Sequence, residues 1–117
     1  MDPGLLHVRV LDTDAAGVVT VRGEIDMANA EKLRRAIAAE MRAAATAGRA
    51  TVVVDLSAVS FLDSSGLAVL IAAHHTPDVR LRLVVITHAV KRVLEVSGMD
   101  KTLDIHPSLD AALAAAG

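Results

Sequence analysis

Four residues in the middle of the chain, Asp63-Ser64-Ser65-Gly66, are the best candidates for chemistry, because they offer a carboxylate and two hydroxyl groups in one short segment. They follow a β-branched run at 51–55 that is typical of a buried strand, and they precede an aliphatic run that is typical of a helix. Such a junction predicts a helix N-cap, with a serine hydroxyl held over unpaired amide groups.

The hydroxyl of Ser64 supports two interpretations. In the first, Ser64 is a switch residue. A phosphate there would add roughly two negative charges and three acceptor oxygens, close to helix amides that attract it and to the Asp63 carboxylate that repels it. In the second, the serine only caps the helix and has no chemical role. The residues alone leave both interpretations open.

Three other kinds of site lack the residues that they need. The hydrolase motif Gly-x-Ser-x-Gly is not met, because Leu62 stands in place of its first glycine. His74 and His75 are adjacent and point about 100° apart on a helix, which does not suit metal ligation. The sequence contains neither common Gly-rich phosphate loop. We therefore expect no catalytic residue, no metal and no cofactor.

The composition argues against nucleic acid as a partner. The chain has 12 basic and 14 acidic residues, a net charge of -2, and no basic block that would attract phosphates. Phe61 is its only aromatic residue, so bases would find no stacking platform. The absence of cysteine excludes disulfides, thiolate chemistry and cysteine-ligated zinc.

The sequence shows no feature that is typical of secretion or of a membrane span. Its start, Met1-Asp-Pro-Gly, carries no charged leader followed by an apolar segment, and the apolar run at 67–73 is far shorter than the roughly 20 residues that cross a bilayer. We expect a cytoplasmic protein with no membrane partner. Its length and its hydrophobic content of 53% predict one globular domain, residues 1–117.

The hydrophobic pattern predicts five strands, of which the first two form an antiparallel hairpin. Their expected ranges are 7–11, 17–22, 51–55, 81–86 and 102–105. Helices follow the later strands, so the predicted fold class is α/β. We expect a mixed, mostly parallel sheet with an N-terminal hairpin and about four packed helices.

Asp26 is the expected N-cap of the first helix, which Gly48 ends in a left-handed conformation. Apolar residues recur along this helix at spacings of three and four: Ala30, Leu33, Ile37, Met41 and Ala44. The second helix, from about Ser64 to His74, is hydrophobic nearly all round. Because a small domain cannot easily bury such a helix on every side, we expect an exposed apolar patch beside Ser64.

Two more helices complete the predicted chain. Thr87 caps the third helix, which ends at Gly98. Pro107 and Ser108 begin the last helix. Its expected packing positions are Leu109, Ala112, Leu113 and Ala116.

Four segments, taken in order, resemble the anti-sigma factor antagonists, which are small single-domain bacterial members of the STAS fold. The segments are Gly23-Glu-Ile-Asp26, Val54-Asp-Leu56, Phe61-Leu-Asp-Ser-Ser-Gly-Leu67 and Ala89-Val-Lys-Arg-Val-Leu-Glu-Val-Ser-Gly98. One Asp-Ser-Ser-Gly would be a weak signal, but the ordered set spans most of the chain and is specific. It favours the interpretation of Ser64 as a switch.

The resemblance implies a protein that binds an anti-sigma factor when it is unphosphorylated and thereby frees a sigma factor. The anti-sigma factor would also be the serine kinase that transfers phosphate from ATP to Ser64, and a separate serine phosphatase would reset the switch. Asp26 is expected beside Ser64, in contact with the kinase. The expected partner-binding residues are Asp26, Asp63, Ser64, Ser65, Gly66 and Leu67.

The sequence departs from the family pattern in two places. Segment 76–80 is shorter than usual and lacks a glycine pair, and Thr87-His88 replaces the usual Ser-Pro. Neither departure touches Ser64. Two alternatives remain open: Ser65 could take the phosphate, or the chain could be a STAS assembly module of a signalling or lipid-transport complex, without phosphorylation.

Overall fold

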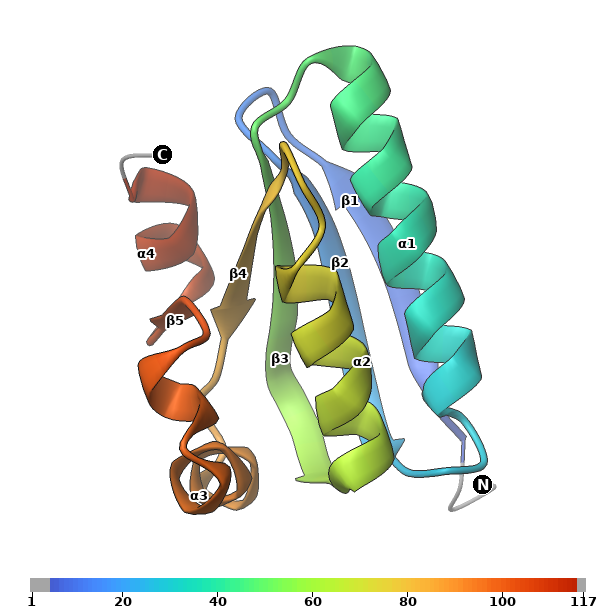
Figure 1. Ribbon diagram of the computed structural model, residues 1–117, viewed down its shortest axis with the longest axis vertical. Helices are drawn as coiled ribbons and strands as arrows, with labels where there is room; N and C mark the ends of the chain where they lie inside the picture. The colour runs from blue at the N-terminus through green and yellow to red at the C-terminus, as the bar shows by residue number, and fades with distance from the viewer. Residues whose placement is uncertain (1–4, 116–117) are drawn as a thin grey trace.

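Five strands form one mixed sheet in the order β1-β2-β3-β4-β5 in the computed structural model of this chain, which describes residues 5–115 (Figure 1). The strands are β1 (His7–Asp12), β2 (Gly17–Ile25), β3 (Thr51–Leu62), β4 (Arg80–Val84) and β5 (Ile105–His106). β1 pairs antiparallel with β2, and every other neighbouring pair is parallel. This sheet, together with the helices, confirms the predicted fold class.

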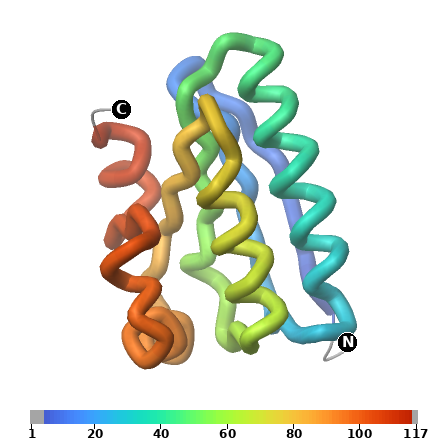
Figure 2. The backbone as a smooth tube through the Cα atoms, in the orientation of Figure 1, coloured from blue at the N-terminus to red at the C-terminus, as the bar shows by residue number. Residues whose placement is uncertain are grey.

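Helices cover both faces of the sheet. They are α1 (Ala30–Ala47), α2 (Ser64–His74), α3 (His88–Ser97) and α4 (Leu109–Ala114), with a 3-10 turn η1 (Met99–Lys101) before β5. α1 and α2 lie side by side on one face, α4 packs on the other, and α1 runs the length of the sheet beside β1 and β2 (Figures 1 and 2). No helix in the described part of the chain is long and apolar enough to span a bilayer.

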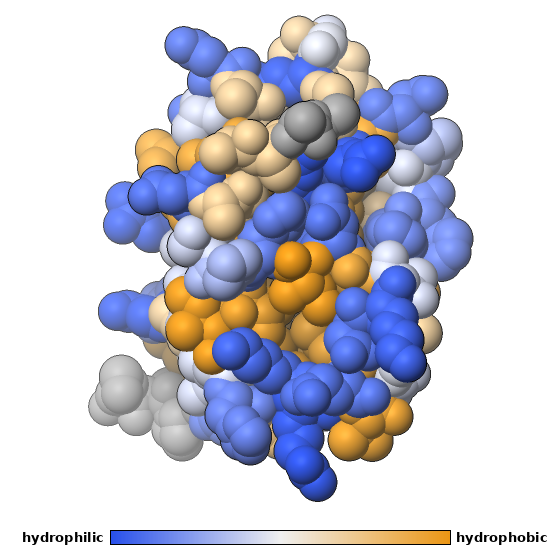
Figure 3. Space-filling model, turned by 90° about the vertical axis from the view of Figure 1, so that its left-hand side faces the viewer, coloured by the Kyte–Doolittle hydropathy of each residue, from blue (hydrophilic) through white to orange (hydrophobic). Residues whose placement is uncertain are grey.

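The central strand β3 begins with a continuous apolar run because it is covered on both faces of the sheet. Val52 and Val54 belong to the larger core beneath α1 and α2, whereas Val53 belongs to a second cluster with Ala112 of α4. Side chains alternate between the faces of a sheet, so a strand that is covered on both faces needs apolar residues at every position. The face formed by α3, β5 and α4 shows an apolar patch surrounded by hydrophilic side chains (Figure 3).

β3 is longer than the sequence predicted, because it continues past Asp55 to Leu62. Its pairing with β2 contains two register shifts, and beyond them Ile25 lies opposite Leu62. A bulge changes which side chains face the core. The alternation of apolar residues is therefore interrupted after Leu56, and the sequence pattern no longer looks like a strand although the pairing continues.

The predicted bounds of two later strands were also wrong. β4 covers Arg80–Val84 instead of 81–86. β5 covers only Ile105–His106 instead of 102–105. The cause at β5 is η1: the backbone N–H groups of Thr102 and Leu103 both donate to Met99 O, so these residues belong to a helical turn.

The expectation that Asp26 caps α1 was wrong. The helix begins at Ala30, and the preceding Asn29 occupies the N-cap position without a side-chain cap bond. Asp26 instead closes a turn, in which its carboxylate accepts from Ala28 N at 2.9 Å and its own N–H donates to Asn29 Oδ1 at 3.0 Å. The buried apolar stripe of α1 is confirmed.

The helix ends agree better with the sequence. Gly48 and Gly98 have φ values of 75° and 77°, which confirms that α1 and α3 end in left-handed residues. Ser108 caps α4, since its Oγ accepts from Ala111 N at 3.0 Å. Thr87 occupies the N-cap position of α3, but its hydroxyl donates to Val59 O at 2.7 Å and makes no cap bond. Ala116 lies outside the described residues.

Candidate functional site

The N-terminus of α2 is capped by the carboxylate of Asp63. Asp63 Oδ1 accepts from Ser65 N at 2.9 Å, from Gly66 N at 3.2 Å and from Ser65 Oγ at 2.5 Å. The Ser65 hydroxyl, followed by these amides, holds the pKa of Asp63 below its usual range. The sequence correctly predicted a cap at this junction, but it wrongly assigned the capping group to a serine hydroxyl.

Ser64 is the first residue of α2 and is exposed. Its hydroxyl has no hydrogen-bond partner among residues 5–115, whereas the hydroxyl of Ser65 is bonded to Asp63. In the cap, Ser65 and Gly66 donate to the Asp63 carboxylate, and the Ser64 side chain takes no part. Its hydroxyl is therefore available to another molecule, and its removal leaves the cap intact.

Gly66 is buried where α2 approaches the sheet. A Cβ atom at this position would collide with the side chains of Leu62 and Ile25. Without a side chain, Gly66 lets the first turn of α2 lie directly on the ends of β2 and β3. Because Ser64 belongs to the same helical turn, this contact also positions Ser64 relative to the sheet.

The loop that holds Asp26 lies beside this helix start. Asp63 N donates to Ile25 O at 3.1 Å, and the backbone of Met27 also helps to lower the pKa of Asp63. Asp26 is half-buried. The structure thus brings the end of β2 and the start of α2 together.

A groove of about 370 Å³ opens next to Ser64, between α2 and α3. It is lined by Leu62, Asp63, Ser64, Leu67, Arg92, Val93, Val96 and Ser97. The side chain of Val96 is 76% exposed. The groove offers an apolar surface with one cation, Arg92, to a protein that approaches Ser64.

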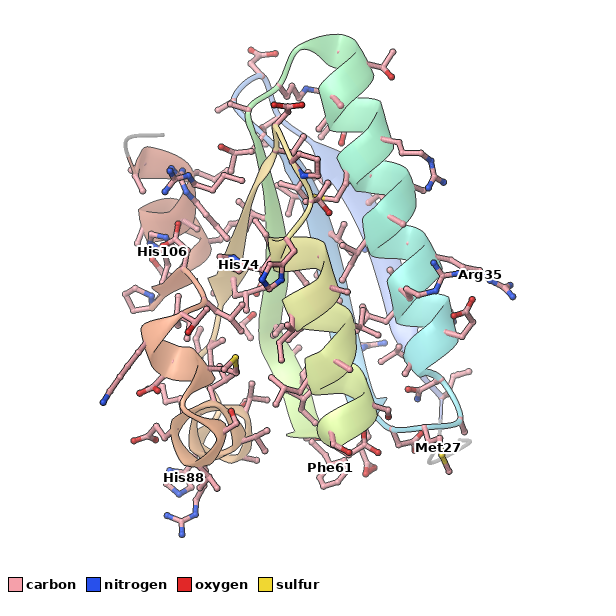
Figure 4. The ribbon with its side chains drawn as sticks, in the orientation of Figure 1. Met27, Arg35, Phe61, His74, His88 and His106 are labelled. Atoms are coloured by element: carbon pink, nitrogen blue, oxygen red, sulfur yellow. The ribbon has the colours of Figure 1, made fainter. Side chains whose placement is uncertain are left out.

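The predicted apolar patch beside Ser64 exists, but α2 supplies less of it than expected. Leu70 is buried, and Leu67 is the apolar side chain of α2 that reaches the groove. Further apolar surface comes from Met27, which is 83% exposed, and from Phe61, which is 44% exposed. Both lie at the end of the molecule where α2 begins (Figure 4).

Sequence reasoning missed Val96, Met27 and Phe61 as surface residues. A signal for Val96 was present, because it falls outside the apolar stripe of α3 that contains the buried Val90 and Leu94. An apolar side chain on the polar side of an amphipathic helix is a candidate contact residue.

Metal ligation has little support in the described part of the chain. Residues 5–115 hold no cluster of three or more histidine, aspartate or glutamate side chains that could bind an ion. His106 Nε2 lies 2.8 Å from Asp104 Oδ1, and Nε of the buried Arg82 lies 3.5 Å from Asp104 Oδ2. Arg82 in turn donates to Ala112 O and Ala115 O, so this group anchors α4 to the sheet.

Comparisons with known proteins agree with this geometry. Residues 7–112 match the STAS domain family. Anti-sigma-F factor antagonist RsfB from Mycobacterium tuberculosis is 34% identical over 113 residues, which cover 95% of this chain and 89% of that protein. The crystal structure of an anti-sigma factor antagonist from Mycobacterium paratuberculosis is 37% identical, with a TM-score of 0.86 over 96% of this chain and 94% of its own.

A more distant structure supports the fold alone. Unphosphorylated SpoIIAA, an anti-sigma factor antagonist, is 21% identical and has a TM-score of 0.69 over 91% of this chain and 93% of its own. The family match covers most of the chain, and the relatives above 30% identity share its length. The chain therefore belongs to the STAS domain family and is similar, within it, to the anti-sigma factor antagonists.

Proposed function

We propose that this chain is an anti-sigma factor antagonist whose unphosphorylated form binds an anti-sigma factor, and that phosphorylation of Ser64 blocks this binding. The names of the relatives support the class of partner. The observation that carries the switch is the free, exposed hydroxyl of Ser64 at the rim of an apolar groove.

The geometry favours Ser64 over Ser65 as the phosphorylated residue. Transfer to Ser65 would require its hydroxyl to leave Asp63, and the phosphate would then lie against the carboxylate that caps the helix. Ser64 can take a phosphate without loss of any cap bond. We therefore expect little change of the backbone upon phosphorylation.

A phosphate on Ser64 would act mainly on the partner. Inside the domain, the helix N-terminus attracts it and the Asp63 carboxylate repels it, so that the two effects partly offset each other. At an interface, a doubly charged group beside Leu67 and Val96 must be desolvated. That cost is several kcal/mol, which corresponds to a loss of affinity of roughly several hundred-fold.

The chain itself needs no catalytic residue for this role, because the nucleotide and the metal belong to the kinase. We propose that the anti-sigma factor is that serine kinase, that a serine phosphatase removes the phosphate, and that all three act in the cytoplasm. In this arrangement Asp26, Asp63 and the groove between α2 and α3 form the docking surface.

Intact-mass measurement after incubation with ATP and each candidate anti-sigma factor of the source bacterium tests the switch. The wild type and Ser65→Ala should gain one phosphate, and Ser64→Ala should gain none. Phosphate on Ser64→Ala but not on Ser65→Ala would contradict the assignment. No phosphate on any form, with binding intact, would favour the assembly module.

A binding assay then tests the role of charge. Ser64→Ala should bind the anti-sigma factor as tightly as the unphosphorylated wild type, and Ser64→Asp should bind at least about tenfold more weakly. Ser64→Asn is the matched uncharged control. Equal affinities for the Asp and Asn forms would rule out charge as the cause.

A further inference from the structure

β1 is an edge strand whose outer side is available for pairing. In an antiparallel ladder, alternate residues direct both backbone groups toward the partner strand, and the residues between them direct both groups outward. Thr13 N donates to Ala16 O at 2.9 Å and continues the register of β1 on β2, so odd-numbered residues bond to β2. Val8, Val10 and Asp12 therefore direct their N–H and C=O groups away from the sheet.

Two contacts before the strand agree with this alternation. The carbonyl of Leu6 accepts from Lys32 Nζ of α1 at 2.5 Å, so an even-numbered carbonyl does point outward. The carbonyl of Leu5 lies against β2, where a Cβ atom on Gly23 would come within 2.7 Å of it. Lys32 thus covers the edge at Leu6, and beyond it no side chain of residues 5–115 is recorded on the outward backbone groups of β1.

Two neighbouring apolar side chains of this edge are exposed. Val10 is 52% exposed and Leu11 is 63% exposed, and they point to opposite faces of the sheet. Exposed edges of natural sheets are usually short, charged or covered, because open edges pair with other chains. The other edge, β5, is only two residues long, so β1, with six residues, is the edge that offers the longer surface for pairing.

The helix above this edge leaves room for a neighbouring chain. Lys32 reaches the edge from α1, and Ala36, Ala39 and Ala43 follow it on the same side at spacings of three and four. The other side of α1, with Met41, faces α2. Because the side chains of Ala36, Ala39 and Ala43 are small, a second helix can approach this part of α1 closely.

We propose that a second copy of this chain pairs its β1 with this edge, antiparallel, about a two-fold axis through Val10. The two Val10 residues then lie opposite each other, and Val8 of each copy lies opposite Asp12 of the other. The outward groups of these residues supply about six backbone hydrogen bonds. This register places no like charges opposite each other, whereas an axis through Arg9 would oppose two guanidinium groups.

The two sheets continue as one in this dimer, because the axis is perpendicular to the sheet. Both α1 helices lie on the same face and turn their alanine flanks toward each other. Since the axis reverses the strand direction, the Ser64 ends of the two copies point in opposite directions. Each copy keeps its own groove open, and the dimer does not depend on the proposed switch.

Mass measurement by analytical ultracentrifugation over a wide concentration range tests the dimer. The wild type should change reversibly from 12.2 kDa to twice that mass. Val10→Lys, which sets two lysines opposite each other, should dimerise at least about tenfold more weakly. Val96→Lys, the same change at an exposed site on α3 away from β1, should dimerise like the wild type. A wild type that stays monomeric near 1 mM, or a Val10→Lys protein that dimerises equally well, would overturn the proposal.

Single cysteines test the register, since the chain has none of its own. The Cα atoms of a directly opposed, hydrogen-bonded pair lie about 5.5 Å apart, within the range of a disulfide. Under mild oxidation, Val10→Cys should form a covalent dimer much faster than Val96→Cys. Leu11→Cys, which would face Arg9, should not. Faster cross-linking of Leu11→Cys than of Val10→Cys would overturn this register.

Discussion

The hydroxyl of Ser65 donates to Asp63 Oδ1 at 2.5 Å, and this bond separates the roles of two adjacent serines. The Ser65 hydroxyl holds the Asp63 carboxylate in its capping position, where it also accepts from the amides of Ser65 and Gly66. Ser64 is left outside the cap, with its hydroxyl toward solvent. The motif therefore contains one structural serine and one that another protein can reach.

Asp63→Ala should destabilise the domain by about 1 kcal/mol, because α2 loses its N-cap. Asp63→Asn keeps an acceptor oxygen and should lose clearly less. Urea denaturation at neutral pH measures both. An equal loss for the two variants would mean that the charge of Asp63, and not its cap bonds, stabilises the helix.

Gly66→Ala should destabilise the domain by about 1–3 kcal/mol, because its methyl group would collide with Leu62 and Ile25. Ala68→Gly, two residues later on the exposed side of α2, is a comparison in which only helix propensity changes, and it should cost about 1 kcal/mol or less. Thermal unfolding of both proteins and of the wild type measures these losses of stability. A Gly66→Ala protein as stable as the wild type would show that α2 can move away from the sheet without cost.

Val96→Asp should weaken binding to the anti-sigma factor at least about tenfold, because it places a charge in the apolar groove beside Ser64. Its effect on the free energy of unfolding should stay within about 0.5 kcal/mol, since the side chain of Val96 is 76% exposed. Ala72→Asp, at an exposed site near the other end of α2, is the control. If both variants bound alike, the groove would not be part of the interface.

Glu40 should make the stability depend on pH. Burial, followed by the nearby Asp12 carboxylate, raises the pKa of Glu40 from 4.5 to about 7. Between these values the unfolded chain loses its proton first, so the free energy of unfolding should fall as the pH rises, by about 3 kcal/mol at most. Above pH 7 the contribution of Glu40 should be constant.

Glu40→Gln isolates this effect, because glutamine has nearly the same shape and does not titrate. Relative to the wild type, it should gain stability between pH 5 and pH 7.5 in urea denaturation. A constant difference between the two proteins across this range would show that Glu40 is ionised in the folded state.

Much of the fold could be predicted because local patterns determine it. The stripe from Ala30 to Ala44 repeats with the period of a helix, and Gly48 and Gly98 mark two helix ends that favour a left-handed residue. These signals depend on neighbours within one or two turns. For the same reason, the segment around Ser64 was recognisable from its residues and their spacing.

The errors have two causes. The length of β3 depends on its bulged pairing with β2, which is distant in the sequence, so no local pattern reveals it. The turn at Asp26 is local, but both Asp26 and Asn29 are residue types that can precede a helix, and the bonds between them place the helix start after Asn29.

The sequence by itself determined the order of the elements, the amphipathic face of α1 and the presence of a serine pair at a helix start. The sequence did not show which serine is free, although the bond that decides it is local and joins Ser65 to Asp63, two residues away. Only the tertiary structure decided that Val96 is exposed while Glu40 is buried, and that β1 has an open side. Exposure is a property of the packed chain, because each side chain's surroundings come from segments far away in the sequence.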